Sequence, residues 1–411
     1  MYTKLGSVPT IIASSATAAK LFLKTHDRVF ASRPHHESSF HLCYEQRNII
    51  FGKYNQYWRD IRKLMTLELL SHRKVTEFQS MRKAELESLM TSLKQAADLR
   101  QTVDLSDRLA TLNEDMTCLM LFGRKFTDID QVFGTQKGLK DVSKDVMDEA
   151  GAFNIGDYFP YLRRLDLHGT ARRMRNLREG FDEIFDKIID EHVQNNKNIN
   201  TKMAGCQDFL DTMMDIANSG DAGFEFDRRH IKAVILDMII AGTDTSSVSV
   251  EWTLAELIRH PIVMKKRITP PQPRLLELCC EGIAKAPPRR KLVPSLEYER
   301  AEVSRDLFNS KNHRYEVICY AAVVFWFIGS NVDLRGHDYE LIPFGAGRRG
   351  CPGLHLGLTI VQLMVAQLVH CFDWELPDGI LPMDLDMTEK FCLVCPRAKH
   401  LLAVPTYRLH K

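Results

Sequence analysis

Helical patterns of apolar and polar residues run through most of the chain. Apolar residues recur every three to four positions with charged residues between them, which is typical of helices that bury one face. Strict alternation predicts a short strand over Leu5–Ser14, and the polar, aromatic, aperiodic stretch His35–Phe51 predicts a loop. We predict a mainly α fold with small β-sheets, and helices over Ala16–Lys24, Tyr57–Leu70, Phe78–Ala97, Leu105–Phe122, Gly169–Asn195, Phe209–Ser219, Arg228–His260 and Leu354–Cys371.

Composition narrows the class of protein. The chain has 411 residues, of which 45% are hydrophobic and 26% charged, with a net charge of +2. A chain of this length can bury a large core, and the near balance of charge argues against nucleic-acid binding. Since no linker or repeat divides the sequence, we expect residues 1–411 to form a single domain.

No stretch approaches the roughly twenty consecutive apolar residues that span a bilayer, and the nearest, Val317–Ile328, is too short. The ten cysteines do not form the doubled CxxC spacing of a zinc site, which predicts reduced thiols in a cytosol-facing compartment.

A glycine-rich loop near the C-terminus, residues 344–353, presents one cysteine just before an apolar helix. Gly345 and Gly347 allow tight turns and the close approach of a flat cofactor. Amides at the start of the helix favour negative charge on the sulfur of Cys351, and a thiolate is a ligand for heme iron. The alternative is an inert cysteine in a glycine-rich turn.

The long helix Arg228–His260 contains a second candidate, residues 241–246. A glycine inside a helix lowers the stability of the helix by about 1 kcal/mol relative to alanine, so the presence of Gly242 calls for an explanation. Ala241 and Gly242 would let a flat cofactor and O2 lie against the backbone, and a local widening of the helix could admit water. Asp244 and Thr245 would then supply a carboxylate and a hydroxyl for proton delivery. The alternative is that they only cap the helix or bond back to its carbonyls.

Two weaker signals complete the set. Trp58 and Arg62 lie four residues apart on one helix face, and both only donate hydrogen bonds, which suits an anionic partner. Packing and surface charge would explain the same spacing. Near the C-terminus, Phe391 and Leu393 would either line an apolar pocket or pack within a hairpin.

These motifs resemble those of the cytochrome P450 family. The loop matches the heme signature Phe-x-x-Gly-x-Arg-x-Cys-x-Gly, the long helix matches the oxygen-activating motif, and Trp58 with Arg62 matches Trp-x-x-x-Arg. The chain looks most similar to plant microsomal (A-type) monooxygenases of specialised metabolism. The heme signature is filled by Phe344, Gly347, Arg349, Cys351 and Gly353.

The resemblance implies the heme-thiolate fold and a monooxygenase that inserts one atom of O2 into an apolar small molecule. Cys351 would be the metal ligand of heme b (iron protoporphyrin IX), and Asp244 and Thr245 would be catalytic. Electrons would come from NADPH-cytochrome P450 reductase, at the cytosolic face of the endoplasmic reticulum membrane. Cofactor binding would involve Trp58, Arg62, Ala241, Gly242, Phe344, Gly345, Gly347, Arg349, Cys351 and Gly353.

The chain departs from the family in two places. It begins where the first sheet of the family's fold begins, so we expect it to be N-terminally incomplete, without the membrane anchor and therefore cytosolic as written. Residues 267–326 carry neither the Glu-x-x-Arg helix that locks the core behind the heme loop nor the Pro-x-Arg-Phe segment that follows it.

A shifted reading frame would explain the second departure. When residues 278–289 are back-translated and read one base later, permitted codons yield Val-Val-Lys-Glu-Ser-Gln-Arg-Leu-His-Pro, which resembles the missing helix. The alternatives to an active enzyme are therefore a catalytically impaired or mis-predicted member of the family, and a helical interaction protein whose cysteine loop is only structural.

Overall fold

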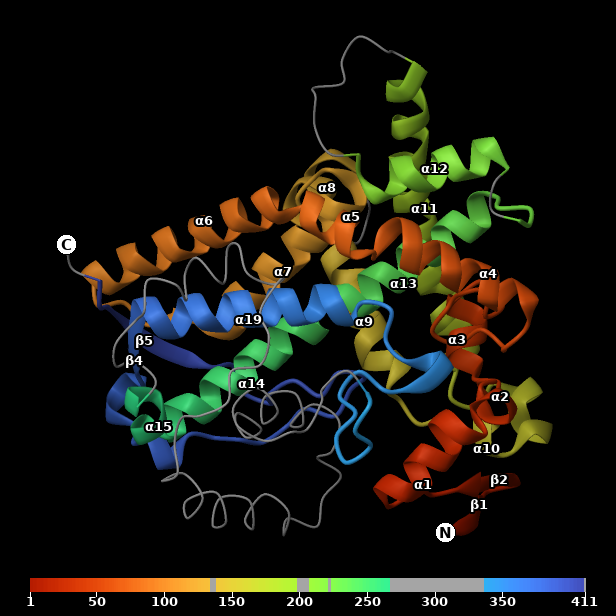
Figure 1. Cartoon of the computed structure of the whole chain (residues 1–411), viewed down its shortest axis with the longest axis horizontal. Coiled ribbons are helices and arrows are strands. Elements are labelled where there is room, and N and C mark those ends of the chain that lie inside the picture. Colours follow the sequence, from red (N-terminus) through yellow and green to blue (C-terminus); the bar gives the residue numbers. More distant parts are fainter. Residues whose placement is uncertain (134–137, 198–206, 221–222, 267–335, 410–411) are drawn as a thin grey trace.

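The computed structural model describes residues 1–133, 138–197, 207–220, 223–266 and 336–409. The chain is mainly helical with two small antiparallel sheets, as predicted (Figure 1). The segment 267–326, where the sequence departs from the family pattern, lies outside the described residues.

The N-terminal elements form a small lobe beside the helical body (Figure 1). The strand predicted over Leu5–Ser14 is in fact the second half of a hairpin, because Gly6 takes a left-handed turn with φ +63°. The elements are β1 (Tyr2–Leu5), β2 (Val8–Ile11), α1 (Ala16–Lys20), the π-helix η1 (Leu21–Thr25), α2 (Asp27–Phe30) and α3 (Glu37–Leu42).

The helix α3 contradicts the loop predicted over His35–Phe51. Its stability comes from distant partners rather than from hydrophobic periodicity. The carboxylate of Glu37 is buried and lies 2.7 Å from Nε of Arg163, and the Glu37 amide donates to Asp157 at 2.9 Å. Such contacts leave no signal in the local sequence pattern.

The helical body was predicted closely. The helices over 105–122, 209–219 and 354–371 have the predicted bounds. The elements are α4 (Gln56–Leu64), the π-helix η2 (Met65–Leu69), α5 (His72–Glu77), α6 (Gln79–Asp98), α7 (Leu105–Phe122), α8 (Phe126–Phe133), α9 (Leu139–Ala150), α10 (Ile155–Tyr158), the 3-10 helix η3 (Pro160–Leu165), α11 (Thr170–Lys197), α12 (Phe209–Ser219), α13 (Arg228–Gly242), α14 (Thr245–Arg259), α15 (Pro261–Lys266) and α19 (Leu354–Cys371).

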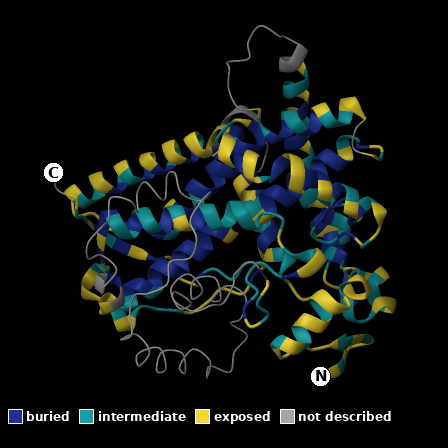
Figure 2. Cartoon of the chain, viewed as in Figure 1, coloured by how far each residue is buried: buried dark blue, intermediate teal, exposed yellow. Residues whose placement is uncertain are grey.

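The helix α7 is the centre of the core. Its C-terminal half packs with α4, α9, α11, α12 and α13, and its N-terminal half packs with α6, α14 and α19. Buried residues are concentrated along these helices (Figure 2). Because α13 and α14 are nearly continuous and lie against α7, a site at their junction is held from within the core.

A three-stranded sheet joins the middle of the chain to its end. The strand order is β3 (Val103–Asp104), β5 (Leu402–Tyr407) and β4 (Phe372–Glu375), with antiparallel pairing throughout. The central strand β5 therefore ties the N-terminus of α7 to the C-terminus of α19.

Two helices among the described residues are long and apolar enough to cross a bilayer by that criterion alone. They are Arg228–Arg259, which joins α13 and α14, and Leu354–Cys371. In their most apolar windows 78% and 39% of residues are buried in the protein, so the first is a core helix and neither is strong evidence for a span.

Candidate active site

The long helix predicted over 228–260 is interrupted at Thr243 and Asp244, between α13 and α14. The side-chain amide of Asn113, on α7, donates to the carbonyl of Gly242 at 2.7 Å and also to that of Thr243. Carbonyls released by a break in a helix need such partners when they are buried. The widening expected from the sequence is thus an interruption supported by α7.

The structure explains why a glycine stands at position 242. A Cβ at this position would lie 3.1 Å from Cγ2 of Thr117 on α7. The missing side chain therefore makes room for a neighbouring helix, while the expectation that it also lets a flat cofactor approach stays a prediction.

Ala241 and Thr245 open a single face of the helix pair. Every residue from 231 to 240 is buried, whereas Ala241 and Thr245 are exposed. They lie four residues apart, one helical turn, and the hydroxyl of Thr245 donates to the carbonyl of Ala241 at 2.8 Å. A core helix that is exposed on one turn only borders a hollow.

Asp244 lies at the same break and is only partly buried. Burial raises the pKa of its carboxyl, and no charged partner offsets this. The side chain does not cap α14, so the capping alternative is wrong for Asp244. The other alternative, a hydroxyl that bonds back to a carbonyl one turn earlier, is what Thr245 makes with Ala241.

The cysteine loop is built on left-handed glycines. Gly345 and Gly347 have φ of +66° and +67°, and a Cβ on Gly347 would lie 1.9 Å from the carbonyl oxygen of Leu23. The amide of Cys351 donates to the carbonyl of Phe344 at 2.8 Å and closes the loop. Both positions need glycine, as predicted. At Gly347 the reason is the close contact with η1, which leaves no room for a Cβ.

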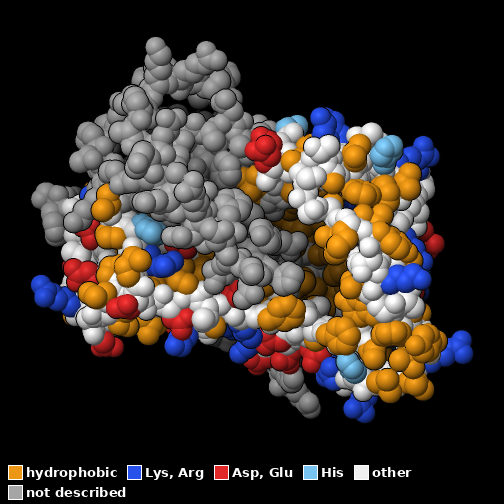
Figure 3. Space-filling model, turned by 90° about the horizontal axis from the view of Figure 1, so that it is seen from below, with side chains coloured by type: hydrophobic (Ala, Val, Ile, Leu, Met, Phe, Trp, Pro, Cys, Tyr) orange, Lys and Arg blue, Asp and Glu red, His pale blue; other side chains and the backbone are white. Residues whose placement is uncertain are grey.

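Cys351 lies at the start of α19 and is exposed, yet the surrounding protein raises the pKa of its thiol by desolvation. The amide of Gly353 and the charge of Arg62 act in the opposite direction and favour the thiolate. Figure 3 shows a hollow lined by hydrophobic side chains and bordered by undescribed residues.

Arg349 and Trp58 use their donors within the protein. The indole of Trp58 donates to the carbonyl of Ile49 at 2.9 Å, and the guanidinium of Arg349 donates to Ala31 at 2.6 Å, to Ile49 at 3.1 Å and to Gly52. An indole has one donor, so Trp58 has none left for a propionate. It also packs under the Arg349 guanidinium, whose carbon lies 4.0 Å from the centre of the Trp58 ring, and its role in anion binding stays a prediction.

Arg62 remains suited to an anion. One nitrogen donates to the carbonyl of Gly350, next to Cys351, and the other guanidinium donors have no protein acceptor among the described residues. The residues present therefore suit a heme: an exposed cysteine, a cation beside it and an exposed turn of the long helix.

Phe391 and Leu393 lie in a hairpin. The amide of Lys390 donates to the carbonyl of Pro396 at 2.8 Å, and the amide of Leu393 approaches Met147 at the end of α9. Phe391 is 81% exposed and Leu393 40% exposed, so neither packs within the hairpin. The pocket-lining interpretation of these side chains stays a prediction.

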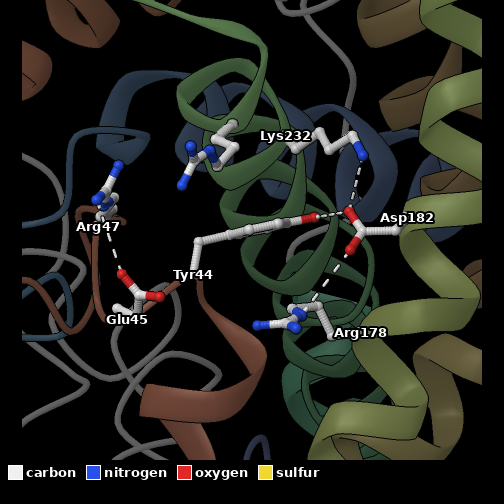
Figure 4. Close-up of a pocket in the computed structure, with 7 residues that line it drawn as sticks. Tyr44, Glu45, Arg47, Arg178, Asp182 and Lys232 are labelled. Carbon is white, nitrogen blue, oxygen red and sulfur yellow. Dashed lines mark hydrogen bonds and ion pairs between the residues drawn. The ribbon is translucent and has the colours of Figure 1, made fainter.

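A separate pocket of about 240 Å³ lies between residues 44–47, α11 and α13 (Figure 4). It contains none of the residues predicted for the site. Asp182 accepts from Tyr44 at 2.7 Å and from Lys232 at 2.9 Å, and Arg178 lies 3.8 Å away. Because four cationic and two anionic side chains line it, this pocket does not suit an apolar substrate. Its lining is Tyr44, Glu45, Arg47, Arg178, Asp182, Arg229 and Lys232.

Sequence reasoning missed two buried acids near the helix break. Asp237 is 3% exposed within α13, and Glu114 is buried on α7. Burial raises the pKa of each carboxyl to about 7. A charged residue inside an apolar helical run was the available signal, since such groups are rarely buried without a partner.

Glu114 makes stability depend on pH in a defined direction. Its folded pKa of about 7 lies above the ordinary value of 4.5, because burial outweighs the attraction of Lys140 and because Asp244, Asp115 and Asp107 add repulsion. The folded state therefore holds the extra proton, and its contribution is present below pH 4.5 and lost as pH rises through 7.

Glu114→Gln is expected to remove this dependence. In the wild type the free energy of unfolding should fall through this group by up to about 3 kcal/mol between pH 4.5 and 7. Urea unfolding at a series of pH values measures it, with Glu87→Gln on the surface of α6 as the control. An unchanged slope in the Glu114 variant would show that Glu114 ionises normally.

Comparisons with known proteins show the family of the chain. The profile described as Cytochrome P450 matches residues 1–268 and 327–402, so the break expected in the resemblance between 267 and 326 is confirmed. The chain is 41% identical to Cytochrome P450 CYP736A12 of Panax ginseng, covering 100% of this chain and 87% of the relative. It is 33% identical to Cytochrome P450 71A1 of Persea americana, covering 94% and 82%, and 32% identical to Germacrene A hydroxylase of Saussurea costus, covering 99% and 86%. The chain therefore belongs to the cytochrome P450 family, among the plant A-type heme monooxygenases.

Proposed function

We propose that this monooxygenase inserts one atom of O2 into an apolar small molecule, with electrons supplied by NADPH-cytochrome P450 reductase. The observation that carries the proposal is Cys351, an exposed thiol just before α19 with the amide of Gly353 and the charge of Arg62 beside it. A sulfur with these two neighbours is placed to be a ligand rather than a packing residue. The break between α13 and α14 supplies the second wall of our proposed site.

We propose that the cofactor is heme b, held by the sulfur of Cys351. When bound, the heme supplies the redox chemistry that activates O2. Arg62 stabilises negative charge beside the sulfur, and Ala241 leaves the helix face open. The left-handed turns at Gly345 and Gly347, with Phe344 and Gly353 at the ends of the loop, fix the place of the cysteine. Arg349 acts through the backbone carbonyls that it binds.

Asp244 and Thr245 are proposed as the catalytic pair. Burial raises the pKa of Asp244, which makes it a better proton carrier near neutral pH than an exposed aspartate. The hydroxyl of Thr245 donates to the carbonyl of Ala241, so its oxygen is free to accept a hydrogen bond from a group in the hollow. The pair can therefore pass a proton to the open helix face.

We propose a terpenoid or phenolic substrate. Relatives are named Germacrene A hydroxylase and Flavonoid 3'-monooxygenase CYP75B137, and the exposed Phe391 is available to contact an apolar ligand. The test is a screen of terpenoids and phenolics for ligand-induced shifts of the heme absorbance, followed by NADPH-dependent turnover with the reductase. Hydroxylated product is expected; no shift and no product with any ligand would argue against the proposal.

We propose that the protein works at the cytosolic face of the endoplasmic reticulum membrane. The hairpin β1–β2 is joined to the end of α10, where the amide of Ser7 donates to the carbonyl of Tyr158 at 2.9 Å. The hairpin and the residues that follow α10 expose the apolar side chains Met1, Tyr2, Leu5, Ile11, Tyr161, Leu165 and Leu167. An exposed apolar surface favours the membrane interface. Binding of the protein to lipid vesicles in a flotation assay tests the proposal.

The segment 267–326 supports a second proposal, that the chain as written is impaired. The family profile passes over residues 269–326, which is where a shifted frame would remove the Glu-x-x-Arg helix.

We further propose that residues 1–411 form one domain, which is supported by the single helix α7 that contributes to both core clusters. The interaction-protein alternative loses its support, since the family is one of enzymes.

A further inference from the structure

Asp237 is a buried acid for which the proposed chemistry has no use. It lies one turn before Ala241 on α13 and is 3% exposed. One carboxylate oxygen accepts from the side-chain amide of Asn48 at 2.6 Å, and the other accepts from the backbone amide of Ile49 at 2.6 Å. The amide of Ile50 also donates to this carboxylate. A buried carboxylate is tolerated only with such partners, so the acid and residues 48–50 depend on each other.

The same segment faces the cysteine loop with its carbonyls. Ile49 accepts from Trp58 at 2.9 Å and from Arg349 at 3.1 Å, while Gly52 accepts from Arg349. The turn is tight, because a Cβ on Gly52 would lie 2.4 Å from the carbonyl oxygen of Asn48. Segment 48–52 therefore cannot shift at one end without shifting at the other.

Ile49 connects the two sides directly. Its amide donates to Asp237 on α13, and its carbonyl accepts from Arg349, two residues before Cys351. We propose that Asp237 is a positioning residue, which fixes segment 48–52 on α13 and thereby places Arg349 and the loop that presents Cys351. The importance of Cys351 rests on the proposed function, but the mechanical coupling does not.

Position 237 requires an aspartate because several hydrogen-bond donors converge on its carboxylate. In Asp237→Asn, one oxygen becomes an amide nitrogen and faces donors that it cannot accept from. A buried donor left unpaired destabilises its surroundings enough to release the segment locally without unfolding the protein.

The test is amide hydrogen exchange read by mass spectrometry on the purified chain. In Asp237→Asn, exchange is expected to become about 10-fold faster in peptides covering residues 48–52 and also in those covering 344–352. Asp115→Asn is the matched control, because Asp115 is also buried and accepts from the backbone amide of Phe126 at 3.0 Å, away from the cysteine loop. Its effect should be confined to residues near 126.

Faster exchange at 48–52 with wild-type exchange at 344–352 would overturn the proposal, and so would no change at either segment. If Asp237→Asn does not fold, Arg349→Gln carries the test from the other end: exchange at 48–52 must rise there too, and wild-type exchange at 48–52 would refute the coupling. Neither outcome depends on bound heme, so failure here is distinguishable from failure of the heme-thiolate proposal.

Discussion

In a chain whose reading frame across residues 267–326 has been restored, Cys351→Ala is expected to abolish the thiolate signature in the reduced carbon monoxide difference spectrum, with loss of turnover. The sulfur is the only candidate iron ligand in the loop of residues 344–353, and alanine offers no lone pair. Its environment fits this role, since the Gly353 amide and Arg62 both favour negative charge on the sulfur.

The matched control is Cys371→Ala, at the other end of α19. Cys371 is also a free cysteine, but it is buried and lies in the packed core. This variant should keep the signature, which would show that the place of a sulfur in the fold, and not its presence alone, decides ligation. A wild-type spectrum in Cys351→Ala would remove the basis of the oxygenase assignment.

Restoring the shifted reading frame across residues 267–326 is expected to raise heme occupancy from a small fraction to nearly one per chain. In the family this region supplies a buried Glu–Arg pair behind the heme loop. Breaking such a pair costs about 3 to 5 kcal/mol, because it leaves a charge buried without its partner. That cost corresponds to a factor of hundreds or more in the stability of the bound state.

The measurement is the ratio of heme absorbance to protein absorbance after purification. A chain carrying a scrambled segment of the same length and composition is the control and should stay low in heme. Full occupancy of the chain as written would contradict the prediction. Sequencing the transcript supplies an independent check, since an uninterrupted frame that encodes the printed residues would end the frame-shift hypothesis.

Local signals were enough for most helices. The bounds of α7 and α12 follow from an aspartate cap at each start, Asp104 and Asp208, and from left-handed glycines at each end, Gly123 and Gly220. Such caps act over four residues, so they can be read directly from the sequence. The cysteine loop was predictable for the same reason.

The features that were missed share another cause, which is that the decisive partner lies far away in sequence. The helix α3 depends on Arg163 and Asp157. A Cβ on Gly242 would contact Thr117, and the indole N–H of Trp58 donates to the carbonyl of Ile49. Periodicity and motif spacing carry no information on such pairs. What the motif residues do toward a cofactor stays a prediction.

The central place of β5 has a consequence for biosynthesis. β3 ends at Asp104, but its pairing partner in β5 begins only at Leu402. Nearly the whole polypeptide must leave the ribosome before this sheet can close, and until then the apolar sides of α6 and α7 lack their cover. Folding with so distant a closing step exposes the nascent chain to aggregation, so synthesis in cells should depend on chaperones.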